Sequence, residues 1–275
     1  MLRTTTLMAV LVFATTTARG QAVSSYNFAG NLEIHSGPGT ALEAAVHPDA
    51  GGDPSVTFES GQIDGEDAQW ASLAQGTGLL MNHGLPSNGG GDYVNVYTLV
   101  MDVSFPELSK WICLYSSNGA IPPANDGEAF INPDNGIGIS GNYGGSVSVD
   151  TWHRVAIRVS SDTGAFTCFI DGVQVQENPD SIEADGRWAL YGPDSPEPEI
   201  NAVQLFLDDT FGEMGAARIA NAALADWALP AGQIRQLGGA TAAPIEIVFV
   251  EPPEVPAAGT IAIIALTAIC LGLSN

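Results

Sequence analysis

The chain has 275 residues, with 31 acidic and 8 basic residues and a net charge of −23 at pH 7. A surface this negative repels nucleic acid, so the composition excludes nucleic acid as a partner. With 32 glycines and only 14% charged residues, the composition is typical of short strands joined by turns.

The first 22 residues have the layout of a secretory signal peptide. Arg3 is followed by an apolar run over residues 7–14 and then by small and polar residues up to Ala22. The run is far shorter than the roughly 20 residues that span a bilayer, which favours export over a membrane helix. Without this segment the chain keeps 6 basic and 31 acidic residues, a net charge of −25, and we expect it to be secreted or held at the cell surface.

Short apolar runs bounded by turn residues predict strands along most of the chain. In residues 153–160 the larger apolar side chains alternate with both arginines, so one face of that strand should look into a core. This spacing predicts an all-β fold, a two-sheet antiparallel jelly-roll sandwich, over residues 23–240. The predicted strands cover residues 93–105, 111–115, 129–131, 137–139, 153–159, 166–170, 173–175 and 202–207.

Local signals add one hairpin and two short helices. Asp171-Gly172 between apolar runs predicts a tight type I′ turn. Helices are predicted over residues 222–227 and 231–237, the second ended by Gly238-Gly239. Cys113 and Cys168 both lie in strand-like runs, and either a disulfide or two buried thiols would be consistent with their positions, whereas Cys270 lies in the tail.

The C-terminal part changes composition. Residues 241–256 are rich in proline and predict an extended linker, and residues 257–275 form a hydrophobic tail. Its apolar run, residues 257–273, is at the lower limit for crossing a bilayer, and no basic residue follows it.

Four segments, in this order, resemble the laminin-G-like (LamG) domains of the concanavalin A-like lectin/glucanase superfamily. They are residues 88–99 (NGGGDYVNVYTL), 125–131 (NDGEAFI), 151–156 (TWHRVA) and 169–172 (FIDG). The resemblance implies a concanavalin A-like jelly roll, often with a structural Ca²⁺, that binds glycans or proteins. The tail, with Val255-Pro256 before its apolar run, is similar to sorting tails of the PEP-CTERM kind, but the basic cluster of such tails is missing. The tail could therefore contact a sorting enzyme or serve as a plain membrane anchor.

The sequence predicts no catalytic residues. Enzymes of the superfamily resemble one another in a Glu-x-Asp-x-x-Glu string, and the nearest string here has Gln62 in the nucleophile position. An amide cannot form a glycosyl ester, so we expect residues 62–66 to be a solvated loop. A non-catalytic binding module for extracellular carbohydrate or protein is the favoured function. A glycan-active hydrolase or lyase and a structural envelope or matrix protein are the alternatives.

Candidate contact residues follow from the chemistry of these ligands. Asp208, Asp209 and Glu213 lie on one turn after an apolar strand and could supply oxygen ligands to Ca²⁺, with a solvated acidic turn as the alternative. Residues 125–128 and Asp92 are weaker metal candidates. Aromatic faces that could stack on a sugar ring are offered by Trp111, Tyr115, Tyr143 and Trp152.

Overall fold

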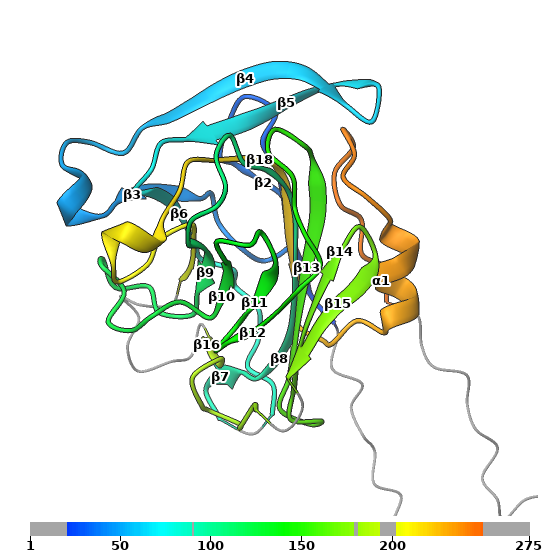
Figure 1. The fold of residues 1–275 in the computed structure, drawn as a ribbon. Helices are drawn as coiled ribbons and strands as arrows, with labels where there is room; N and C mark the ends of the chain where they lie inside the picture. Colours follow the sequence, from blue (N-terminus) through cyan, green and yellow to red (C-terminus); the bar gives the residue numbers. More distant parts are fainter. Residues whose placement is uncertain (1–20, 90, 179–180, 193–201, 250–275) are drawn as a thin grey trace, which may run out of the picture.

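The structure is a computed structural model that describes residues 21–89, 91–178, 181–192 and 202–249. In these residues two large antiparallel sheets form a sandwich, which confirms the predicted fold class (Figure 1). Residues 1–20 of the predicted signal peptide and the predicted hydrophobic tail lie outside the described residues. None of the helices in the described part of the chain is long and apolar enough to cross a membrane.

The larger sheet has nine strands in the order β15-β14-β13-β8-β18-β1-β2, with β5 also pairing with β18 and β4 pairing with β5. Its strands are β1 (Val23–Asn27), β2 (Ile34–Ser36), β4 (Val56–Ile63), β5 (Glu66–Leu73), β8 (Val96–Ser104), β13 (His153–Ser160), β14 (Ala165–Ile170), β15 (Val173–Asn178) and β18 (Ala217–Ala225).

The second sheet has seven strands in the order β12-β11-β10-β9-β17-β6-β3, and β7 and β16 pair separately. These strands are β3 (Glu43–Val46), β6 (Thr77–Met81), β7 (Tyr93–Val94), β9 (Ile112–Ser116), β10 (Ala129–Ile131), β11 (Ile137–Ile139), β12 (Asn142–Gly144), β16 (Leu190–Tyr191) and β17 (Val203–Leu205). The helical elements used below are α1 (Ala231–Leu237) and the 3₁₀ turn η3 (Phe211–Glu213).

The main core lies between the two sheets. On β13, Val155, Ile157 and Val159 are buried in it, which confirms the predicted inward face. The opposite face of the nine-stranded sheet is covered as well, because α1 and the chain after it bury a second apolar layer that includes Phe169 and Ile234. Because both faces of the nine-stranded sheet are covered, the sequences of its central strands do not alternate clearly between apolar and polar residues.

The predicted Asp-Gly hairpin is confirmed. Asp171 and Gly172 have φ angles of 51° and 79°, and Ile170 pairs with Val173 across the turn. Both central residues need positive φ in a type I′ turn, a conformation that Asp tolerates and Gly adopts freely.

One of the two predicted helices is wrong. Residues 222–225 belong to β18, which pairs with β1, β5 and β8 in the middle of the large sheet. The alanines there favour a helix as isolated residues, but pairing on both sides overrides this propensity. The other predicted helix is confirmed as α1.

The predicted loop at residues 62–66 is a hairpin. Gln62 ends β4, Glu66 begins β5, and Asp64 and Gly65 form the turn with φ angles of 50° and 82°. Gln62, Asp64 and Glu66 are exposed, as expected, whereas Ile63 is buried. The Asp-Gly signal seen at residue 171 was therefore present here too.

The first part of the predicted linker is bound to the sandwich. The Asn221 side-chain amide donates to the carbonyl oxygens of Thr241 and Ala243, each at 3.0 Å, and the Ser25 hydroxyl donates to Ile245. Ile245 is 3% exposed and joins the second apolar layer. We call residues 240–249 the C-terminal segment, and an extended linker can begin only after it.

Cys113 and Cys168 are free, buried thiols on different sheets, so the disulfide alternative does not hold in this structure.

Candidate functional site

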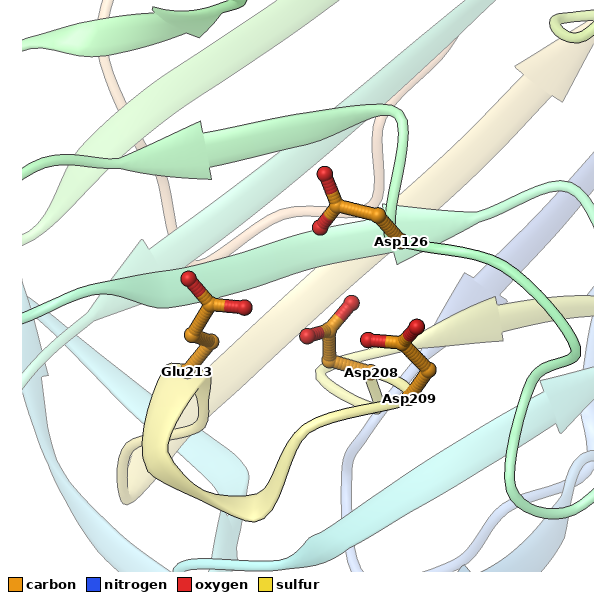
Figure 2. A group of neighbouring side chains, drawn as sticks. All are labelled: Asp126, Asp208, Asp209 and Glu213. Atoms are coloured by element: carbon orange, nitrogen blue, oxygen red, sulfur yellow. The ribbon is translucent and has the colours of Figure 1, made fainter.

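Four carboxylates meet beside the seven-stranded sheet. Asp126 comes from the loop between β9 and β10, Asp208 and Asp209 follow β17, and Glu213 is on η3. One oxygen from each lies within 4.8 Å of the others, and Figure 2 shows the side chains directed at a common centre. We call these four residues the carboxylate cluster.

Asp208 is the fixed member of the cluster. It is fully buried, and its carboxylate accepts hydrogen bonds from the backbone N–H groups of Gly127 at 2.8 Å and Thr210 at 3.3 Å. Gly127 has no room for a side chain, because an added Cβ would lie 2.4 Å from Cys113 Sγ. The β9–β10 loop is thereby held tightly against the turn after β17, which brings Asp126 to the other three.

The cluster concentrates negative charge. Burial raises the pKa of Asp208 to about 7, and the neighbouring Asp209 and Asp126 raise it further against the two backbone hydrogen bonds. Burial and the charge of Asp126 also raise the pKa of Glu213. Carboxylates that resist ionisation together are stabilised when a cation neutralises them. This arrangement could hold a metal ion.

The structure brings the three predicted metal ligands together. Asp208, Asp209 and Glu213 do lie together, and Asp126, a weaker candidate in the sequence, completes the group. Asp92 is not part of it.

A polar groove adjoins the cluster, and Asp126 belongs to both. The groove has a volume of about 440 Å³ and is bordered by two tyrosines, so we call it the tyrosine groove. It is lined by Tyr93, Ser117, Asn118, Asn125, Asp126, Glu128, Asp185, Gly186, Arg187, Ala189 and Tyr191.

The two tyrosines face each other across the small sheet formed by β7 and β16. Tyr93 pairs with Tyr191 in register, and their ring centroids are 5.2 Å apart. Both side chains are partly exposed, so they offer aromatic surface to a ligand.

The charged residues of the groove are positioned by hydrogen bonds. Asp185 accepts from the Asn95 side-chain amide at 2.9 Å, and its backbone N–H donates to the same amide at 2.7 Å. Arg187 donates to the carbonyl oxygens of Asp126 at 3.0 Å and Gly127 at 2.6 Å. The groove therefore presents one acceptor and one donor group with restricted freedom.

Glu128 lies at the base of this groove and is 2% exposed. Burial raises its pKa to about 8, against the hydrogen bond from the Ser117 backbone and the charge of Arg187. The carboxyl group is therefore largely protonated at neutral pH.

The four aromatic residues predicted to contact a sugar lie in three different places. Trp111 and Tyr143, with ring centroids 5.4 Å apart, line a hollow of about 190 Å³ that also includes Asp126 and Glu213, on the cluster itself. Trp152 lies in a separate groove. Tyr115 is wrong as a surface contact, because it is fully buried and its hydroxyl is 2.9 Å from that of Tyr97.

Sequence reasoning missed most of the tyrosine groove. Tyr93 and Tyr191 come together only through the pairing of β7 with β16, almost 100 residues apart. Nothing in the sequence of residues 185–190 (DGRWAL) marks Asp185 and Arg187 as groove residues.

The raised pKa values predict an unusual pH dependence of the metal-free protein. The usual values are 3.8 for Asp and 4.5 for Glu, so the folded state keeps protons on Asp208 and Glu128 that the unfolded chain has lost. Their contribution to stability is complete below about pH 4 and is lost as the pH rises through 7 and 8. In EDTA we expect the melting temperature to fall from pH 5 to pH 8, and to fall less in Asp208→Asn with Glu128→Gln. An equal fall in both proteins would contradict this assignment.

No protein-family profile and no curated protein matches this chain. Among solved structures it is similar to domain 4 of AbnA, a GH43 extracellular arabinanase from Geobacillus stearothermophilus, in complex with arabinotriose. The TM-score is 0.54 at 16% identity, over 79% of this chain and 98% of that one. The botulinum neurotoxin serotype G binding domain gives a TM-score of 0.48 at 11% identity, over 78% and 50% of the two chains. The binding domain of Paraclostridial Mosquitocidal Protein 1 gives 0.46 at 13%, over 79% and 51%. The first similarity establishes the β-sandwich fold.

Proposed function

We propose that the chain is an exported, non-catalytic module that binds extracellular carbohydrate in the tyrosine groove. The observation that carries this proposal is the groove itself, which joins a partly exposed tyrosine pair to fixed polar side chains and to the carboxylate cluster. The resemblance to LamG domains, in which such binding is common, is part of the proposal. A protein ligand is the alternative partner.

The chemistry of the groove suits a sugar. Tyrosine rings can pack against the C–H face of a pyranose, while hydroxyl groups need both donors and acceptors at its edge. Asp185 supplies an acceptor and Arg187 a donor, and Asn118 and Asn125 can act as either. Because Asp185 and Arg187 are already held in place, little side-chain freedom is lost on binding.

We also propose that the carboxylate cluster binds Ca²⁺. Calcium takes six to eight oxygen ligands, and four carboxylates with nearby backbone carbonyls and water can supply them. A bound Ca²⁺ would also reduce the negative charge that Asp126 brings to the border of the groove, where it lies 3.6 Å from Arg187. The metal would thus support ligand binding as well as folding.

Hydrolysis remains the second candidate because of Glu128. A buried carboxyl group with a raised pKa at the base of a groove is what a general acid in a glycosidase requires. A glycosidase also needs a second carboxylate as nucleophile or base on the other side of the bond. Asp126 and Asp185 are the other carboxylates that line the groove. Glu66, the last residue of the string at residues 62–66, is on an exposed hairpin and does not line the groove.

The location of the protein belongs to the same proposal. The predicted signal peptide would export the domain, and the tail would hold it at the cell surface if it is retained.

The test is a glycan microarray probed with the full chain in millimolar CaCl₂. We expect Tyr93→Ala to weaken binding to the best glycan about tenfold, since a well-placed aromatic contact is worth more than 1 kcal/mol. Phe58→Ala is the matched control, because Phe58 is 41% exposed on β4 and lies outside the groove. Equal binding by both variants, or no bound glycan, would overturn the proposal.

A further inference from the structure

A second groove lies beyond the C-terminal end of α1, where the turn of the β4–β5 hairpin approaches the start of β13 and the chain that leaves α1 (Figure 1). Its volume is about 730 Å³, larger than that of the tyrosine groove. We call it the Trp152 groove. Its lining includes Asp64, Asp150, Thr151, Trp152, Asp171 and Thr241.

Trp152 is a partly exposed ring on a rigid support. Its ring centroid is 5.2 Å from that of Trp70, at an interplanar angle of 61°. Trp70 is held in turn by a hydrogen bond from its indole N–H to Glu59 at 3.1 Å. Both indoles also pack on the apolar group of Ile63 and Ala240. A ring fixed in this way can stack on a ligand without losing further freedom.

The carboxylates around Trp152 are fixed acceptors. Asp171 accepts hydrogen bonds from the His153 ring and from the Arg154 backbone, both at 2.8 Å. Asp150 accepts from Arg218 at 2.7 Å. Asp64, on the hairpin turn, has no basic partner among the described residues. The negative charges of Asp171 and Asp150 are therefore partly compensated by the groups that donate to them.

The ligand chemistry follows from this lining. None of the residues that line the groove is Lys, Arg or His, so no cation is available to bind an anionic sugar. The carboxylates can accept hydrogen bonds from the hydroxyl groups of a ligand, and the indole can stack on a flat apolar face of the same ligand. Ala242, the residue after Thr241, lines a further hollow of about 560 Å³, which also presents the amides of Asn27, Gln62 and Gln69. We propose that the Trp152 groove is a second carbohydrate-binding site, selective for uncharged glycans.

This site is independent of the tyrosine groove, since the two share no lining residue. One domain with two such sites could bind two segments of a polysaccharide and gain avidity without a second domain. The inference therefore holds or fails separately from the proposed function.

The experiment is calorimetric titration of the full chain with neutral oligosaccharides of β-glucan and chitin, and with acidic oligosaccharides of alginate. The variants are Trp152→Ala, Tyr93→Ala and the double variant. We expect Tyr93→Ala to keep a binding phase for a neutral oligosaccharide that Trp152→Ala weakens at least tenfold and the double variant lacks. Acidic oligosaccharides should show no phase that depends on Trp152.

Two controls keep the result interpretable. Trp152→Phe keeps an aromatic ring beside Trp70, so it should fold normally and lose only part of the affinity. Circular dichroism of each variant identifies any loss of binding that comes from unfolding. If Trp152→Ala is unfolded, the affinity of Trp152→Phe is used to test the site. Neutral-glycan binding that is unchanged in the folded Trp152 variants, or its complete loss in Tyr93→Ala alone, would overturn the second site. Loss of binding in Trp152 variants with none in Tyr93→Ala would support it and refute the first groove.

Discussion

Calcium is expected to raise the melting temperature of the full chain by about 5–10 °C when its concentration is a hundred times its Kd. A ligand that binds only the folded state then adds about 2.7 kcal/mol, and each kcal/mol moves the melting temperature of a domain this size by about 2–4 °C. The physical reason is the carboxylate cluster, where Asp208 is buried and burial raises the pKa of Glu213 as well. The measurement is a thermal melt in EDTA and in millimolar CaCl₂.

Replacement of two cluster residues should remove this effect. In Asp208→Asn with Asp209→Asn we expect no calcium-dependent shift, because two of the four carboxylates are lost. The matched control is Glu66→Gln with Asp67→Asn, which removes two exposed charges from the β4–β5 hairpin. The control should keep the whole shift. No shift in the wild type, or an equal shift in the double cluster variant, would exclude this metal site.

Replacement of Arg154 by Met is expected to lower the free energy of unfolding by about 3–5 kcal/mol. Arg154 forms two hydrogen bonds to Asp102, of 2.7 and 2.8 Å, and Asp102 is fully buried. Without the guanidinium, a buried carboxylate is left with the Asn221 amide as its remaining side-chain partner. Arg154 also donates to Leu237 and Thr241, so the start of the C-terminal segment should loosen.

Denaturant unfolding measures this loss, and two further variants define its origin. Arg218→Met breaks a partly exposed pair with Asp150 and should cost no more than about 1 kcal/mol. Arg154→Met combined with Asp102→Leu should recover part of the stability, because no unpaired charge remains. An Arg154→Met protein as stable as the Arg218→Met protein would show that the buried pair is unimportant.

The fold could be predicted from the sequence where strands are framed by clear turns. Asp171-Gly172 marked its hairpin, and the alternation of residues 153–160 gave the inward face of β13. The prediction failed where the tertiary setting overrides local preference. Residues 222–225 have the composition of a helix, but they fill the middle of β18. Five of the eight residues of β4 are exposed and one is buried, so it has no apolar pattern that could mark it as a strand.

The candidate site was predictable only for residues that are neighbours in the chain. Asp208, Asp209 and Glu213 follow one strand, whereas Asp126 joins them because Gly127 bonds to Asp208. The aromatic candidates show the same limit. All five residues of β9 are buried, so its side chains do not alternate between core and solvent, and no pattern could separate the buried Tyr115 from the accessible Trp111.

The most direct test of the central claim, a groove that binds a glycan without cleaving it, is one titration followed by analysis of the product. The best neutral or acidic glycan from the array is titrated into the full chain at saturating Ca²⁺, and the mixture is then resolved by anion-exchange chromatography after prolonged incubation. We predict saturable binding that Tyr93→Ala weakens about tenfold, with the glycan recovered at its original length. Shortened products that form with the wild type and not with Glu128→Gln would contradict the account and identify the protein as a hydrolase or lyase.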